Sequence, residues 1–203
     1  MTSRIYLDWN ATAPLRPDAR ATMVAALDCI GNPSSVHAEG RAARRLVEDA
    51  RAAIAAATGA QPRNVVLTSG GTEANALALM PGVRRGSSHP LQRALVSAIE
   101  HPSVLAGGGF APEAIVAVPV TEAGTVDLER LRALLAETGP ALVSVMLANN
   151  ETGAIQPVAE IAALTHAAGG LLHVDAVQAF GKIDCNISRL DCDLLVISSH
   201  KVG

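Results

Sequence analysis

Two apolar runs near the end of the chain constrain its fold more than any other feature. Residues 171–178 read LLHVDAVQ, and residues 194–201 read LLVISSHK. Each run has the length of a strand, begins with aliphatic side chains and ends in polar ones. Buried parallel strands have this near-continuous apolar pattern, and α/β sheets present functional side chains at the carboxyl ends of such strands. The runs therefore predict a parallel sheet with polar groups along one edge.

The polar residues that end these runs include Asp175, Ser198, His200 and Lys201. A carboxylate and an amine at neighbouring strand ends have two interpretations. They can form an ordinary ion pair at the sheet edge. They can also serve pyridoxal 5'-phosphate (PLP), because a lysine binds this cofactor covalently and an acidic partner keeps its pyridine nitrogen protonated. The two runs alone do not separate these interpretations.

Strand-length apolar runs alternate with helical periods along most of the 203 residues. This alternation implies an α/β fold with a mostly parallel, doubly wound sheet, right-handed crossovers and helices on both faces. The length suits one large domain. Strands are predicted at 64–68, 94–99, 114–119, 141–147, 171–175 and 193–198, and helices at 17–27, 40–58, 126–136 and 157–168, with a further helix from the 69–75 turn to residue 80.

Composition excludes several classes of protein. The net charge of −3 provides no basic surface for nucleic acid. No apolar run approaches the length of a membrane span, and the first ten residues lack the apolar region of a signal peptide, so we expect a cytoplasmic protein without a membrane partner. The three cysteines, Cys29, Cys185 and Cys192, lack the spacing of a zinc site, so we expect reduced, structural thiols and no metal.

Residues 68–75 read TSGGTEAN and lead from a predicted strand into a helix. The two glycines allow a ligand to approach the backbone closely. Ser69, Thr72 and the free N–H groups of the helix start would face an anion with the favourable end of the helix dipole. The stretch is therefore either a phosphate cradle or an ordinary turn and capping sequence.

Polar residues also follow the other predicted strands. An imidazole at a strand end can stack on a flat heterocycle and exchange protons, although a lone histidine is more often structural. Because the carboxyl ends of parallel strands meet at one edge, so many polar groups favour a single shared site. They are Ser69 to Thr72, His101, Asn150, Asp175 with Gln178, and Ser198 with His200 and Lys201.

These motifs, taken in order, resemble those of a known family. They are LDWNAT at 7–12, GNPSSVH at 31–37, TSGGTEAN at 68–75, EH at 100–101, NNETG at 149–153, HVDAVQ at 173–178 and SSHK at 198–201. The chain resembles the cysteine desulfurases of the NifS/IscS group, within the class-V aminotransferases of PLP fold type I. The resemblance extends from residue 5 to the last residue.

The resemblance implies a role for each residue at the sheet edge. Lys201 would bind PLP covalently and move protons at the substrate Cα. Asp175 would pair with the pyridinium nitrogen, and His101 would stack on the ring and take part in proton transfer. Gln178 would contact the phenolic oxygen, and Asn150 would lie beside the ring and the substrate carboxylate. The phosphate would be held by Gly71, Thr72, Ser198 and His200.

The implied reaction converts L-cysteine to L-alanine and leaves the sulfur as a persulfide on an enzyme cysteine. The sulfur would then pass to an acceptor protein, such as a scaffold for iron–sulfur cluster assembly, or to thiocofactor synthesis. Members of the group are homodimers, so the complete protein is expected to be a homodimer. Ser199 stands where many members have glycine, and this departure is expected to be tolerable.

Chains of this group run to roughly twice the present length, which predicts an incomplete domain organisation. Residues 1–15 are expected to belong with the small domain, and residues 16–203 to form an incomplete PLP-binding large domain. The C-terminal small domain, which carries the nucleophilic cysteine, is expected to be absent. No environment that would lower a thiol pKa is legible around the three cysteines, so this chain alone is not expected to complete sulfur transfer.

Three other interpretations stay open. Within the same fold, a selenocysteine lyase or another class-V enzyme such as an aminotransferase would keep Lys201, Asp175 and His101. A non-catalytic scaffold could keep the cofactor domain without a nucleophile. A phosphate-binding module of the nucleotide type, built on Ser69 to Thr72, would have no use for Lys201.

Overall fold

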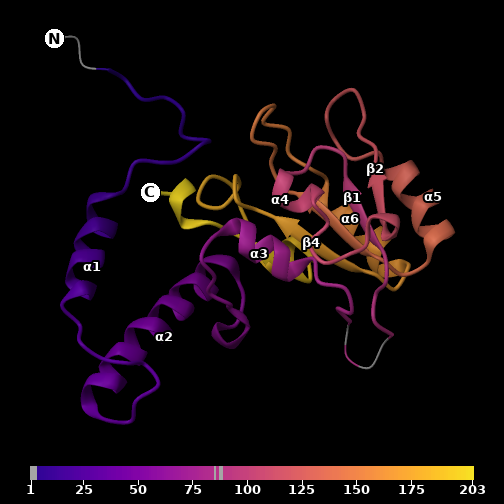
Figure 1. Cartoon of the computed structure of the whole chain (residues 1–203). Coiled ribbons are helices and arrows are strands. Elements are labelled where there is room, and N and C mark those ends of the chain that lie inside the picture. Colours follow the sequence, from indigo (N-terminus) through magenta and orange to yellow (C-terminus); the bar gives the residue numbers. More distant parts are fainter. Residues whose placement is uncertain (1–3, 85, 87–88) are drawn as a thin grey trace. The chain divides into compact units, whose positions relative to one another are not determined.

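The computed structural model describes residues 4–84, 86 and 89–203, which fall into two compact units. One unit contains Met1–Leu67 and Ser199–Gly203, and the other contains Thr68–Ser198 (Figure 1). The domain boundary expected after residue 15 stays a prediction.

The N-terminal unit contains the two predicted helices of the first sixty residues. α1 (Pro17–Leu27) has the predicted bounds, with proline in the first turn, where its missing N–H costs nothing. α2 (Ala38–Thr58) begins before the predicted residue 40, because the side chain of His37 caps it and accepts from Gly40 N at 3.3 Å. Gly59 ends α2 with a φ of +71°, a conformation that favours glycine.

The strand predicted at 64–68 is wrong. A 3₁₀ turn, η1 (Pro62–Asn64), occupies its beginning, and residues 65–68 form no strand in the part of the chain that the structure describes. Val66 is 73% exposed and Leu67 is 46% exposed. An extended apolar segment becomes a strand only where a neighbouring backbone pairs with its N–H and C=O groups, and residue order does not reveal that neighbour.

A parallel sheet forms the centre of the Thr68–Ser198 unit. Its five strands lie in the order β2-β1-β3-β4-β5, and every neighbouring pair is parallel. They correspond to the last five predicted strands, β4 with the predicted bounds and the other four shorter, so the predicted parallel α/β sheet is confirmed. The strands are β1 (Ala94–Ser97), β2 (Ile115–Val118), which follows η2 (Pro112–Ala114), β3 (Leu142–Met146), β4 (Leu171–Asp175) and β5 (Leu194–Val196).

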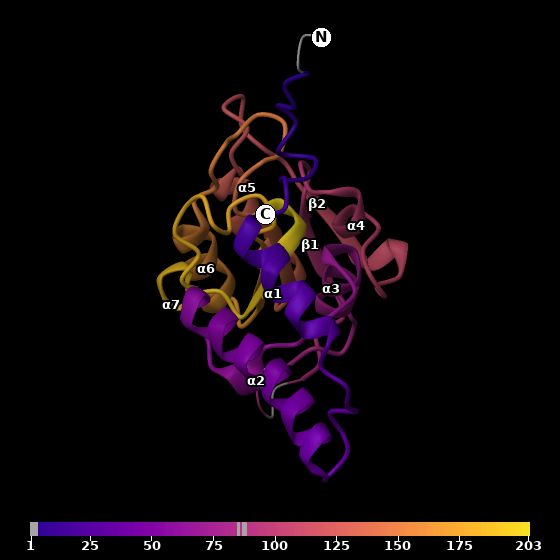
Figure 2. The same cartoon turned by 90° about the vertical axis from the view of Figure 1, so that its left-hand side faces the viewer.

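Helices cover both faces of this sheet, as Figure 2 shows. On one face Leu131 and Ile161 belong to a large buried apolar cluster. On the other face Leu79 and Val104 belong to a second, smaller cluster. The first face carries α5 (Leu128–Thr138), α6 (Val158–Ala167) and α7 (Ile187–Leu190), and the second carries α3 (Gly71–Ala78) and α4 (Pro102–Leu105).

β4 is an example of why the strands of this sheet have continuous apolar sequences. Every residue of β4 is buried, because helices cover both of its faces. Leu172 and Val174 belong to the cluster beneath α5 and α6, and Leu171 belongs to the cluster on the opposite face. Since side chains alternate along a strand, His173 and Asp175 share the face of Leu171, which is also the face of α3 and α4.

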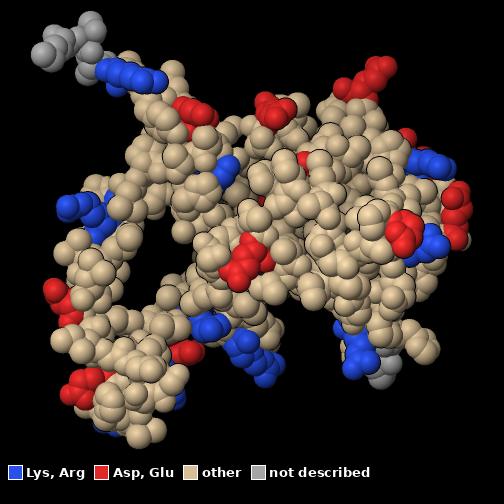
Figure 3. Space-filling model, in the orientation of Figure 1, with Lys and Arg blue, Asp and Glu red and all other residues tan. Residues whose placement is uncertain are grey.

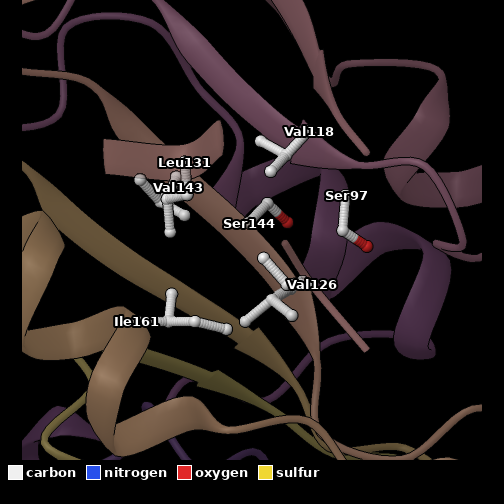
Figure 4. A pocket seen from close by; sticks show the side chains of 8 residues that line it. Ser97, Val118, Val126, Leu131, Val143, Ser144 and Ile161 are labelled. Atoms are coloured by element: carbon white, nitrogen blue, oxygen red, sulfur yellow. The ribbon is translucent and has the colours of Figure 1, made fainter. Parts of the chain in front are cut away.

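A crevice within the larger core is packing rather than a ligand site. Figure 4 shows it between the sheet, α5 and α6, with mainly aliphatic side chains around it. These side chains leave no space for a water molecule. Its lining residues are Ser97, Val118, Val126, Leu131, Val143, Ser144, Val145 and Ile161.

Charged side chains of both signs are spread over the face shown in Figure 3. Red and blue adjoin around α5, where Arg132 pairs with Glu129 at 2.5 Å and Arg130 with Glu137 at 3.8 Å. Such exposed pairs contribute little to stability. Among the described residues, no helix combines the length and the hydropathy that crossing a membrane requires.

Candidate active site

Asp175 ends β4 and is buried, with 5% of its surface exposed. Both oxygens of its carboxylate accept hydrogen bonds. Val177 N donates to Oδ1 at 2.9 Å, and Asn75 Nδ2 donates to Oδ2 at 2.9 Å. Two directional bonds fix the plane of the carboxylate, so the group is held in one orientation at the carboxyl edge of the sheet.

Asn75 lies on the buried side of α3 and is only 1% exposed. Besides bonding Asp175, its Nδ2 donates to Ser103 Oγ at 3.0 Å. Asn75 belongs to the TSGGTEAN motif, but the sequence analysis predicted no function for it. One feature of the sequence could have indicated this role. Asn75 is a polar residue one helical turn after the two glycines, on the same helix face as buried apolar residues, and a buried polar group needs a hydrogen-bond partner.

His101 follows β1 and is the N-cap of α4. Its Nδ1 accepts from Ser103 N at 3.1 Å and lies 2.7 Å from Ser103 Oγ. Ser103 also bonds Asn75, so a continuous line of hydrogen bonds joins His101 to Asp175. The structure therefore brings together two of the residues expected at the site, through two side chains that were not expected there.

Two further ionisable groups are buried near Asp175. Glu100 Oε1 accepts from Met146 N at 2.7 Å and from Ser97 Oγ. Burial raises the pKa of Glu100 to about 8, and the charge of Asp175 adds to this effect. His173 lies 2.8 Å from Ser144 Oγ through Nδ1, and burial lowers its pKa in spite of the nearby Asp175 charge. Glu100 Oε2 and His173 Nε2 have no hydrogen-bond partner among the residues that the structure describes.

The start of α3 lies beside the end of β5. A Cβ placed on Gly71 would lie 3.4 Å from Val177 Cγ2 and 3.7 Å from Ser198 Cβ, so this space stays open only with glycine. Gly70 provides no side-chain cap for the helix, which leaves the first N–H groups of α3 available for an anion. Ser69 N is already taken, because it donates to Glu73 Oε2 at 2.6 Å and thereby lowers the pKa of Glu73.

Asn150 and Gln178 lie in turns that follow β3 and β4. Asn149 organises the first turn, because its Oδ1 accepts from Glu151 N and Thr152 N, both at 2.9 Å. This turn places Asn150 at the carboxyl edge of the sheet. Gln178 Oε1 accepts from Lys182 Nζ at 3.1 Å.

His200 and Lys201 belong to the N-terminal unit, in η3 (Ser199–Lys201). His200 O accepts from Ala13 N at 2.8 Å and from Thr12 Oγ1 at 3.2 Å. Lys201 Nζ donates to Asn10 O. The lysine turn and the segment of the LDWNAT motif therefore lie side by side within this unit, although they are nearly two hundred positions apart in the sequence.

The parallel order of the sheet accounts for much of the expected clustering. β1, β3, β4 and β5 are consecutive neighbours, so the residues that follow them meet at one edge. One part of the expectation is wrong: Ser69 to Thr72 follow an extended segment and not a strand. The residues that do follow these strands within the Thr68–Ser198 unit are His101, Asn150, Asp175, Gln178 and Ser198.

Comparison with known proteins decides the family. Residues 5–203 match the family model for Aminotransferase class-V. The chain belongs to this family. It is 42% identical to a cysteine desulfurase of Cereibacter sphaeroides, over 98% of this chain and 52% of the relative. This class-V chain thus spans about half the length of the curated relatives that it matches.

Solved structures agree with this assignment. The X-ray structure of a NifS-like protein from Rickettsia africae has a TM-score of 0.88 and 40% identity, and covers 98% of this class-V chain and 55% of that protein. A structure described as SspA in complex with cysteine has a TM-score of 0.83 and 28% identity, over 97% of this chain and 57% of that one. The fold is therefore the PLP fold type I that the motifs predict.

Membership of the class-V family implies PLP, and the residues present fit this group. A buried carboxylate held by two donors suits a protonated pyridine nitrogen. The uncapped start of α3, the room above Gly71 and the neighbouring Ser198 hydroxyl suit a phosphate. The carboxylate, the helix start and the hydroxyl of the Thr68–Ser198 unit thus fit this cofactor.

Proposed function

We propose that this chain provides the PLP-binding part of a cysteine desulfurase. The observation that carries the proposal is the Asp175 carboxylate, fixed by Val177 N and Asn75 at the end of β4 in a chain of the class-V family. Similarity to proteins described as cysteine desulfurases favours L-cysteine as substrate and a cysteine persulfide as sulfur carrier.

The proposed site residues would contact different parts of the cofactor. Asp175 would accept a hydrogen bond from the pyridine nitrogen, and its two existing donors would keep it in place for that bond. His101 would lie against the ring, and Gln178 and Asn150 would bond its polar groups. Gly71, Thr72, Ser198 and His200 would hold the phosphate, because glycine leaves room and hydroxyl and imidazole groups can donate to an anion.

Bound PLP supplies an electron sink that stabilises negative charge at the substrate Cα. Lys201 is the residue proposed to hold the cofactor covalently and to carry the proton to and from Cα. Its Nζ donates to Asn10 O, so the LDWNAT segment orients this amine within the N-terminal unit. We further propose a homodimer in the cytoplasm, which passes sulfur to an acceptor protein such as an iron–sulfur scaffold.

Covalent trapping tests this proposal, because the chain contains only two lysines, Lys182 and Lys201. The protein is incubated with PLP, borohydride makes the lysine–cofactor bond permanent, and the labelled peptide is mapped by mass spectrometry. Lys201 is expected to carry the label. Lys182 is an internal control for nonspecific reaction, since it lies on the surface and bonds Gln178.

Three variants complete the design. Lys182→Ala is expected to keep the label, and Lys201→Ala is expected to lose it. Asp175→Ala is expected to reduce labelling of Lys201 strongly, because the pyridine nitrogen loses its acidic partner. Equal labelling of both lysines in the wild type, or labelling of Lys182 alone, would show that the chain does not form this site.

The two buried cysteines are not expected to carry the persulfide. Burial raises the pKa of Cys185 to about 11 and that of Cys192 to about 12, so almost none of either thiol is ionised at neutral pH. Brief treatment with iodoacetamide at pH 8 should alkylate the partly exposed Cys29 at least ten times faster than either, by the usual dependence on thiolate content and access. Peptide mapping measures this, with urea-unfolded protein as the control in which all three react.

A further inference from the structure

A line of hydrogen bonds joins Asp175 to His101 through Asn75 and Ser103, and the proposed function gives Ser103 no role. Asn75 Nδ2 lies 2.9 Å from Asp175 Oδ2 and 3.0 Å from Ser103 Oγ. Ser103 Oγ in turn lies 2.7 Å from His101 Nδ1. All four residues belong to the Thr68–Ser198 unit, and Asn75 and Asp175 are buried in it.

The carboxylate of Asp175 sets the direction of each bond in this line. An ionised carboxylate only accepts, so Asn75 turns its NH₂ group and not its oxygen toward Asp175. The same nitrogen donates its second hydrogen to Ser103 Oγ. A hydroxyl has one proton, and since Ser103 Oγ accepts from Asn75, that proton is left for His101 Nδ1.

A second donor acts on the same ring nitrogen. Ser103 N donates to His101 Nδ1 at 3.1 Å, because His101 is the N-cap of α4. Nδ1 therefore faces two donors from one residue. A ring nitrogen that accepts hydrogen bonds carries no proton, so the neutral imidazole has its proton on Nε2.

We infer that Ser103, oriented by Asn75, is a positioning residue that fixes His101 as the Nε2–H tautomer. His101 then presents a hydrogen-bond donor at Nε2. Protonation of Nδ1 would break the hydrogen bond from Ser103 N and reverse the one with Ser103 Oγ. The line also connects His101 to Asp175, the other residue proposed to contact the cofactor ring. The catalytic meaning of this arrangement rests on the proposed function, but the tautomer itself does not.

Long-range ¹H–¹⁵N correlation spectra of the imidazole groups test the inference, because they report which ring nitrogen carries the proton. They are recorded on the purified chain at a pH where His101 is neutral, without added cofactor. His101→Gln identifies the signals by their loss. The wild type is expected to show His101 with its proton on Nε2.

Two variants distinguish the effect of the Ser103 hydroxyl on the tautomer from a general change in the fold. Ser103→Ala should move the tautomer ratio toward Nδ1–H by about fivefold, the effect of losing one of two hydrogen bonds. Ser103→Thr keeps a hydroxyl and is expected to restore the wild-type ratio. A wild-type ring protonated on Nδ1 overturns the inference whatever the variants show, and so does a Ser103→Ala spectrum identical to the wild type. Because no PLP is present, failure to bind the cofactor leaves this result unaffected.

Discussion

Replacement of Glu100 by glutamine is expected to raise stability relative to the wild type progressively as the pH increases from 5 to 8. The folded protein holds the pKa of Glu100 at about 8, because its carboxyl is buried and lies near Asp175. In the unfolded chain the same group titrates near its ordinary value of 4.5. Between these values the unfolded chain has released the proton and the folded protein has kept it.

This difference in bound protons decides whether the unfolding free energy rises or falls with pH. The unfolded state binds fewer protons than the folded state in this range, so the wild type loses stability as the pH rises, by about 1.4 kcal/mol for each pH unit. Glutamine does not titrate, and its Oε1 can still accept from Met146 N and Ser97 Oγ. The difference in unfolding free energy between variant and wild type should therefore grow at about the same rate.

Urea unfolding at several pH values measures this difference. His173, which burial keeps neutral, produces the opposite trend below its ordinary pKa of 6.5, but it is present in both proteins and cancels. The matched control is Glu113→Gln, at an exposed position. A free-energy difference that stays constant from pH 5 to pH 8 would show that Glu100 ionises in the folded protein as it does in solvent.

Leu172→Ala is expected to destabilise the Thr68–Ser198 unit by about 2–5 kcal/mol, the range measured for such truncations in packed cores. Leu172 is completely buried in β4, in the cluster that joins the sheet to α5 and α6. Its neighbouring strands fix the backbone on both sides, so the surrounding side chains cannot close the cavity that alanine leaves.

The matched control is Leu77→Ala, the same substitution on α3 at a side chain that is 50% exposed. Its expected effect is within about 0.5 kcal/mol, since alanine favours helix and little buried surface is lost. Chemical denaturation followed by far-UV circular dichroism gives both values. Equal effects of the two substitutions would contradict the layered core described above.

The elements that local sequence predicted well are those whose signals lie within the segment itself. Within the stretch predicted as a helix at 126–136, Asp127 caps α5, with its carboxylate accepting from Arg130 N at 3.0 Å. The runs at 171–175 and 193–198 became β4 and β5, because apolar segments of that length are stable only when helices cover both faces of a sheet. The motifs also led to the class-V family, which the comparison confirms.

The segment at 64–68 marks the limit of this kind of prediction. Its composition matches that of a strand, yet no strand among the described residues pairs with its backbone, and Val66 is largely exposed. Strand propensity describes how a side chain fits a pleated surface. Whether that surface exists depends on the rest of the chain.

By itself, the sequence determined the parallel α/β class, the last five strands in their order and the polar residues at the ends of those strands. The tertiary structure alone decided how those residues are held. Asn75 meets Asp175 across one hundred positions of sequence, and Ser103 completes the link to His101. Hydrogen bonds act over about 3 Å, so only the packing of α3 and α4 on the sheet could bring these donors and acceptors within reach.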